Sequence, residues 1–162
     1  MTVHIMTKGD HHDCLKMDNG RYPKYGYTAL EFEADLYDRY TCGLVVKDHQ
    51  HKVLGYCLLD NGTETVLDVF MMCVMEGAGD LAVATEMVNY LKRMRLNSLR
   101  PYLFMKVRCE DFDMCLVLNS LGLHCEGYDT DDLSRDGDLV FSYSLADEPL
   151  GLPYYEKDLD SD

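Results

Sequence analysis

The 162-residue sequence has no tryptophan, few basic residues and no long hydrophobic run. A membrane-spanning helix needs roughly 18–20 apolar residues, and no stretch approaches that length, so we expect no transmembrane segment. The N-terminus reaches Gly9-Asp10 before any apolar core forms, and we expect no signal peptide. The seven cysteines are an odd number without a CxxC pair, which favours buried thiols in a reducing, cytoplasmic setting over a disulfide framework.

Basic residues are scarce, with 15 Lys and Arg against 29 Asp and Glu, for a net charge of −14. Direct nucleic-acid binding is disfavoured because affinity for phosphate backbones depends on Lys and Arg. The acidity favours a basic protein or an amine as partner or substrate, or it serves solubility alone. Mimicry of nucleic acid by an acidic surface is a further alternative.

The histidines do not predict a metal site. His11, His12 and Asp13 are adjacent rather than spaced by four residues on a helix, so they cannot readily face one ion. His49 and His51 flank a predicted hairpin turn and are likewise not expected to bind a metal ion. We therefore predict no metal ligands.

Hydrophobic periodicity predicts one α/β domain over residues 1–145, followed by an acidic tail at 146–162. The strand 65–75 is apolar on both faces and is expected to be central. Strand patterns occur at 2–7, in a hairpin over 42–62, and at 65–75, 102–109, 123–129 and 139–145. Helix patterns occur at 9–17, 28–40, 80–97 and 111–122, and the stretch 18–26 is rich in turn residues.

The predicted helices have identifiable ends and faces. Asp111 is the expected N-cap and Gly122 the expected C-cap of the helix 111–122. In the helix 28–40, the spacing of Leu30, Ala34 and Tyr37 predicts that these residues face the core. In the helix 80–97 the expected core-facing residues are Ala84, Met87, Val88, Leu91 and Met94.

The segment 75–82, MEGAGDLA, lies between a predicted strand and a predicted helix. A strand, a glycine turn and a helix are typical of a phosphate-binding loop. This loop carries two carboxylates, Glu76 and Asp80, and no basic residue. Asp80 is also suited to the first turn of its own helix, where it would compete with a phosphate for backbone N–H groups.

The order of elements resembles the GNAT superfamily of N-acetyltransferases over roughly residues 2–145. The segment 69–91 is similar to the family's cofactor motif, and the segment 111–123 to a later helix. The resemblance implies a mixed, mostly antiparallel central sheet flanked by helices, with splayed central strands. Short, divergent members are encoded by some tailed phages, and the chain is similar to them.

The resemblance also implies roles for individual residues. Acetyl-CoA would contact the strand at Phe70, Met71, Met72 and Cys73. The loop would contribute Gly77, Ala78, Gly79, Asp80 and Leu81. A carboxylate of Glu64 or Asp68, both expected on the strand, would deprotonate the attacking amine. The alternative is that Glu64 and Asp68 are ordinary surface carboxylates and that Cys73 is a core thiol.

The sequence departs from the family pattern at four positions. Glu76 stands at the basic or amide position, Leu81 at the small residue, Leu118 at the tyrosine and Asp111 at the asparagine. We therefore expect acetyl-CoA binding to be weak or lost. Two functions remain open: an N-acyltransferase acting on a basic amine, and an inactive pseudo-enzyme that binds a basic protein partner as a monomer or homodimer. The acidic loop 129–138 and the tail would steer either ligand.

Overall fold

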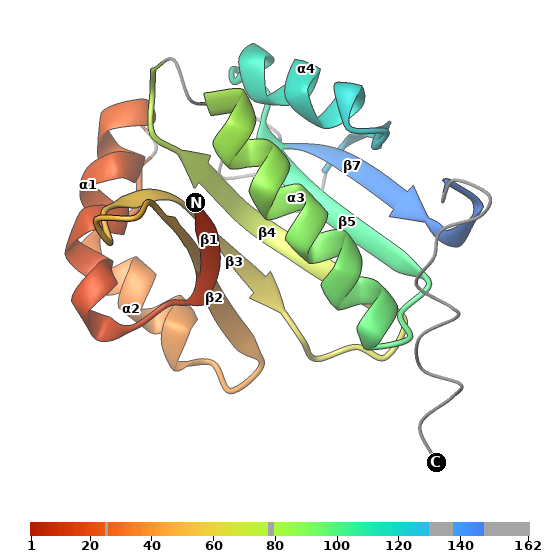
Figure 1. Ribbon diagram of the computed structural model, residues 1–162, viewed down its shortest axis with the longest axis horizontal. Coiled ribbons are helices and arrows are strands. Elements are labelled where there is room, and N and C mark those ends of the chain that lie inside the picture. Colours follow the sequence, from red (N-terminus) through yellow and green to blue (C-terminus); the bar gives the residue numbers. More distant parts are fainter. Residues whose placement is uncertain (25, 78–79, 130–137, 148–162) are drawn as a thin grey trace.

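The computed structural model describes residues 1–24, 26–77, 80–129 and 138–147. Within these residues a seven-stranded sheet has the order β1-β2-β3-β4-β5-β7-β6 (Figure 1). Neighbouring strands are antiparallel except for the parallel pair β4 and β5. The strands are β1 (Thr2–Ile5), β2 (Thr41–Lys47), β3 (Val53–Asp60), β4 (Val66–Val74), β5 (Tyr102–Arg108), β6 (His124–Tyr128) and β7 (Asp138–Ser144).

Helices cover both faces of the sheet (Figure 1). Helices α3 (Asp80–Asn97) and α4 (Phe112–Ser120) lie on one face, and α1 (His11–Arg21) and α2 (Ala29–Tyr37) lie on the other, against β2, β3 and β4. Two cores result: one under α3 and α4, and a smaller one under α1 and α2. The expected mixed sheet flanked by helices is confirmed. No helix in the described part of the chain is long and apolar enough to cross a membrane.

Helix α1 is longer than the sequence predicted, because it continues through Asp18 to Arg21. The turn-forming residues are held in the helix by tertiary contacts. Asp18 is fully buried, and its carboxylate accepts hydrogen bonds from Tyr27 N (2.6 Å) and the Tyr56 hydroxyl (2.9 Å). Asn19 donates to Leu15 O and to Tyr27 O. These contacts override the local preference of Asp and Asn for turns.

The predicted core face of α2 is wrong. Leu30 is 79% exposed and Tyr37 80% exposed, whereas Phe32 is fully buried against Tyr27 and Tyr56. Burying the face of α2 that carries the large Phe32 ring removes more apolar area from water than burying the face that carries Leu30. The helix begins at the N-cap Thr28, which exchanges hydrogen bonds with Glu31.

The elements around the site agree with the sequence prediction. The hairpin β2–β3, the strand β4 and the helix α3 have the expected positions, and all five predicted apolar residues of α3 belong to or pack against the larger core. Asp111 caps α4 by accepting a hydrogen bond from Met114 N. The cysteines are free thiols. The loop 130–137 and the tail from residue 148 lie outside the described residues.

Candidate functional site

The parallel strands β4 and β5 separate toward their carboxyl ends. Their paired residues run from Val66 opposite Tyr102 to Val69 opposite Met105. Beyond this point β4 continues to Val74 while β5 continues to Arg108. The expected splay is therefore present, and it begins just before Met71. We call the region between residues 70–74 of β4 and residues 106–108 of β5, at the edge where α3 and α4 begin, the slot.

A β-bulge lies where the two strands separate. On β3, Leu58 faces Met71 and the adjacent Leu59 faces Val69, so Phe70 is the additional residue of β4. Among the described residues Phe70 thus has no Cα partner in β3 or in β5. A bulge leaves backbone groups outside the ladder and redirects side chains. The bulge therefore lies one residue beyond the last paired residue of β4 and β5.

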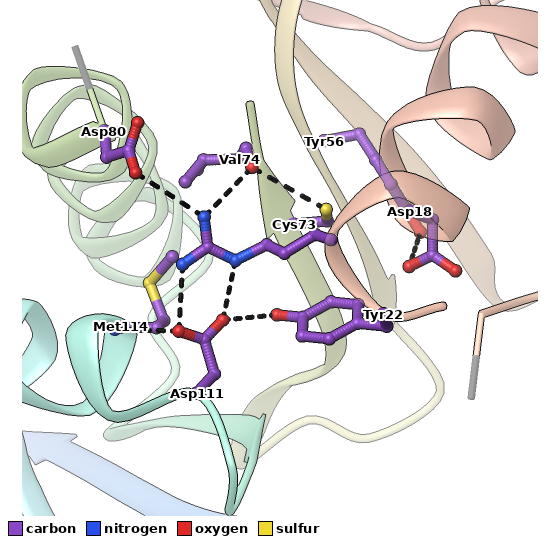
Figure 2. Close-up of polar contacts among 9 residues, drawn as sticks. Asp18, Tyr22, Tyr56, Cys73, Val74, Asp80, Asp111 and Met114 are labelled. Carbon is purple, nitrogen blue, oxygen red and sulfur yellow. Dashed lines mark hydrogen bonds and ion pairs between the residues drawn. The ribbon is translucent and has the colours of Figure 1, made fainter. Parts of the chain in front are cut away.

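Arg21, at the end of α1, bridges the two sides of the slot. Its Nε and Nη2 each donate to the Asp111 carboxylate at 2.8 Å, and its Nη1 donates to Val74 O at 3.3 Å. Val74 ends β4, and Asp111 caps the helix that follows β5. The same Nη1 lies 3.6 Å from Asp80 Oδ2 at the start of α3. Figure 2 shows Val74, Asp80 and Asp111 arranged around this guanidinium group.

The Arg21–Asp111 pair is buried, with side-chain exposures of 8% and 5%. Asp111 also accepts a 2.6 Å hydrogen bond from the Tyr22 hydroxyl (Figure 2). Burial by itself would raise the pKa of the Asp111 carboxyl, but the bonds from Arg21 and Tyr22 outweigh it and hold the pKa below its usual value. The hydrogen bonds that Arg21 donates to Asp111 raise the pKa of Arg21. Asp111 is therefore ionised at neutral pH.

The mouth of the slot is acidic. A cavity of about 280 Å³ is lined by Arg21, Tyr22, Glu76, Glu110, Asp111, Phe112 and Asp113. Four of these residues are carboxylates, and the one cation is already bound to Asp111. In addition, Asp80 Oδ1 is buried and accepts no hydrogen bond from the described residues. Among the described residues that line this cavity, carboxylates therefore outnumber the guanidinium group.

The remaining residues of the predicted cofactor loop occupy varied positions. Gly77 is exposed with φ +139°, a conformation that favours glycine. Asp80 is the first residue of α3, and Leu81 is 57% exposed. Ala78 and Gly79 lie outside the described residues. On β4, Met72 faces the larger core, while Met71 and Cys73 face the smaller core under α1 and α2.

The two candidate bases differ in position. Glu64 is exposed and precedes β4, so the prediction that it lies on the strand is wrong. Asp68 lies on β4 between the inward-facing Leu67 and Val69, so its side chain is on the opposite face, as is that of Phe70. Burial raises the pKa of Asp68, with Asp60 and Asp129 acting in the same direction and Lys106 opposing them. A half-buried carboxylate with a raised pKa is suited to accept a proton.

The structure changes one expectation, for the acidic loop at Asp129, and agrees with another, for Cys73. Asp129, expected to belong to a solvated acidic loop, forms a 2.7 Å ion pair with Lys106 on β5. Cys73 is fully buried, and burial raises the pKa of its thiol, as expected for a core thiol. Leu118, at the position expected for a tyrosine, is fully buried in the larger core.

The chain was compared with protein families, curated proteins and solved structures. No protein-family model matches the sequence, and no curated protein matches it. Solved structures do match. An aminoglycoside 6'-acetyltransferase type Ii is similar with a TM-score of 0.72 at 14% identity, over 92% of this chain and 99% of that chain. The fold is that of the GNAT N-acetyltransferases.

Two further structures of this fold contain coenzyme A. An aminoglycoside 6'-N-acetyltransferase complexed with coenzyme A has a TM-score of 0.68 at 13% identity, over 92% of this chain and 98% of that chain. A spermidine N-acetyltransferase from Vibrio cholerae in complex with CoA and spermine has a TM-score of 0.68 at 16% identity, over 90% of this chain and 97% of that chain. At these identities the likeness establishes the fold of this chain.

The contribution of Arg21 was not predicted from the sequence. Asp111 was expected as a helix cap at the family's asparagine position, and Arg21 was expected in a turn, 90 positions earlier in the chain. The loop 75–82 lacks a basic residue of its own, yet α1 places a guanidinium group beside it. A sequence signal for this pairing does not exist within either segment, because the contact depends on how α1 packs across the sheet.

Proposed function

We propose that the protein is an N-acyltransferase that moves an acyl group from a thioester to an amine. The observation that carries the proposal is the bulge at Phe70, which lies where β4 and β5 separate. A backbone N–H outside the ladder can stabilise the negative charge that develops on a thioester carbonyl oxygen under attack. A thioester that entered the slot between the two strands would meet that group.

Asp68 is proposed as the general base. It lies two residues before Phe70 and on the same face of β4. Burial raises the pKa of Asp68 toward neutral pH, and a general base is most effective when its pKa lies near the working pH. Asp68 would take the proton that the amine loses as nitrogen bonds to the acyl carbon. The thiolate that leaves would take its proton from solvent, since Leu118 offers none.

The donor is proposed to be acetyl-CoA, bound weakly. Glu76 and Asp80 would oppose its diphosphate at the start of α3, where the helix dipole otherwise favours an anion. The acceptor is proposed to be a cationic amine, because the protein has a net charge of −14. The similar solved structures are named for aminoglycosides and spermidine, which are amines.

The proposal is tested by amine-dependent release of free CoA from acetyl-CoA, followed with a thiol reagent in the presence of aminoglycosides, polyamines and lysine-rich peptides. Thiol release that requires an amine, with the acetylated amine detected by mass spectrometry, would support acyl transfer. Absence of any acetylated product across the panel at millimolar acetyl-CoA would contradict it. Asp68→Asn provides the negative control and Glu64→Gln the matched carboxylate control.

A second candidate is a protein of this fold that binds a basic partner without catalysis. The Arg21–Asp111 pair favours it, because this pair spans the slot through which a donor would enter. Pull-down with immobilised acidic and basic peptides at low and high salt would test it, since steering between opposite charges weakens as salt screens them. Binding that tolerates Asp68→Asn and needs no acetyl-CoA would favour this candidate.

A further inference from the structure

We infer that the Arg21–Asp111 ion pair is a latch that holds the slot between β4 and β5 closed, and that the slot opens when this pair separates. The latch follows from the contacts alone. Its consequence for the donor, which would gain entry only to the open slot, rests on the proposed function.

Arg21 lies where the ladder between β4 and β5 has ended. β4 and β5 are parallel, so their carboxyl ends lie at one edge of the sheet, and the described ladder between them ends at Val69 and Met105. Hydrogen bonds between the strands therefore do not hold this edge together. Arg21 contacts Val74 O on the β4 side and Asp111 on the β5 side. One side chain thus replaces the missing ladder at the opening.

The contacts between Arg21 and Asp111 are strong. Two parallel N–H···O bonds from a guanidinium to a carboxylate are among the strongest side-chain contacts, and both partners are buried. Tyr22, the residue after Arg21, adds a 2.6 Å hydrogen bond to the same carboxylate. The Arg108 guanidinium carbon lies 4.7 Å from the Tyr22 ring centroid, so the end of β5 also contacts this segment. The end of α1 is therefore attached to both edges of the slot.

In the closed state, carboxylates outnumber the guanidinium group that binds them. One guanidinium serves two carboxylates, since Asp80 Oδ2 lies 3.6 Å away while Asp111 holds the bidentate position. Asp80 Oδ1 is buried without a hydrogen bond from the described residues. When Asp111 loses Arg21, the guanidinium keeps a carboxylate partner, because Asp80 is already beside it. A latch needs this second position.

Cys73 reports whether the latch is closed, without any ligand. Its thiol and Arg21 Nη1 share one acceptor, Val74 O, at 3.8 and 3.3 Å, and the thiol is fully buried (Figure 2). Cys57, which is equally buried, faces the other core and provides an internal control for global unfolding. The rate at which iodoacetamide labels each cysteine, resolved by peptide mass spectrometry, therefore separates local opening from unfolding.

The test compares Asp111→Asn with Asp113→Asn. Asp111→Asn keeps an acceptor for the helix cap but removes the charge that binds Arg21. Asp113→Asn is the control, because it removes the same charge from an exposed residue in the same helical turn. We expect labelling of Cys73 to be at least tenfold faster in Asp111→Asn, with Cys57 unchanged, and unaltered in Asp113→Asn. Equal Cys73 rates in wild type and Asp111→Asn would overturn the latch.

Arg21→Lys is a second variant that leaves every charge in place. A lysine cannot make the two-pronged bond to Asp111 and also donate to Val74 O, so labelling of Cys73 should again accelerate. Acceleration in Asp111→Asn without acceleration in Arg21→Lys would mean that charge near the thiol, not opening, set the rate, and would overturn the inference. If both variants open but neither binds acetyl-CoA more tightly than wild type by calorimetry, the latch stands and the proposed donor is wrong.

Discussion

Tyr56 of β3 and Asp18 of α1 are joined by a 2.9 Å hydrogen bond, and both side chains are fully buried. The bond fixes α1 on the sheet. It thereby sets the position of Arg21, which lies one helical turn further along α1. Burial, followed by the negative charge of Asp18, raises the pKa of Tyr56, so the phenol remains a hydrogen-bond donor throughout the neutral range.

Tyr56→Phe is expected to lower the free energy of unfolding by about 1–3 kcal/mol, because Asp18 loses a buried hydrogen bond. Urea denaturation followed by circular dichroism measures this change. Tyr37→Phe is the matched control: Tyr37 is 80% exposed, and its loss of a hydroxyl should change stability by less than about 0.5 kcal/mol. Equal effects of the two substitutions would refute the structural role assigned to Tyr56.

The second prediction concerns the stability of the folded protein at acid pH. The pKa of Asp111 is lower in the folded protein than its usual value of about 3.9. Ionised Asp111 therefore contributes its full stabilisation above the usual pKa. This stabilisation is lost as the pH falls toward and through the pKa of the folded protein, because the unfolded chain binds the proton more readily. Between pH 5 and pH 3 we expect wild type to lose more stability than Asp111→Asn. Parallel pH dependences for the two proteins would show that the ion pair contributes nothing, and Asp113→Asn controls for the lost charge.

The third prediction concerns Asp68. Since its pKa is raised, the rate of acyl transfer should rise with pH through that pKa as the carboxyl becomes ionised. Asp68→Asn is expected to lower kcat/KM by about 10²–10⁴ and to remove this limb of the profile. Glu64→Gln should have little effect, because Glu64 is exposed and precedes β4. An unchanged rate in Asp68→Asn would exclude this residue as the base.

The fourth prediction concerns the loop. Glu76 is exposed beside the mouth of the slot. Glu76→Arg should strengthen acetyl-CoA binding by about 1–2 kcal/mol, because an exposed charge near a phosphate contributes about 1 kcal/mol in water and the substitution changes its sign. Calorimetric titration measures the difference. Glu86→Arg makes the same change of charge further along α3; if it improves binding equally, the effect comes from net charge and not from the loop.

The order of elements could be predicted from the sequence because strands and helices alternate with clear hydrophobic periods, as in β4 and α3. The splay of β4 and β5 followed from the resemblance. The core face of α2 could not be predicted, because both Phe32 and Leu30 offer an apolar side and tertiary packing chooses between them. The end of α1 could not be predicted for the same reason, because Asp18 and Asn19 favour turns locally and tertiary contacts hold them in the helix.

The candidate site was predictable only where it depends on local chain geometry. The strand residues from Phe70 to Cys73 and the start of α3 at Asp80 lie where expected. The Arg21–Asp111 bridge was not predicted, since its partners are distant in sequence and each has an ordinary local role. The bulge residue was likewise unpredictable, because register depends on how β3 and β4 pair.

The central claim is that the slot between β4 and β5 receives a thioester donor, and backbone hydrogen exchange with and without acetyl-CoA tests it most directly. The measurement is best made on both wild type and Asp111→Asn, at acetyl-CoA concentrations up to several millimolar. The account predicts slower exchange in Phe70–Val74 and in the segment 106–112, with greater protection in Asp111→Asn. Protection confined to other elements, or none in either protein, would contradict it.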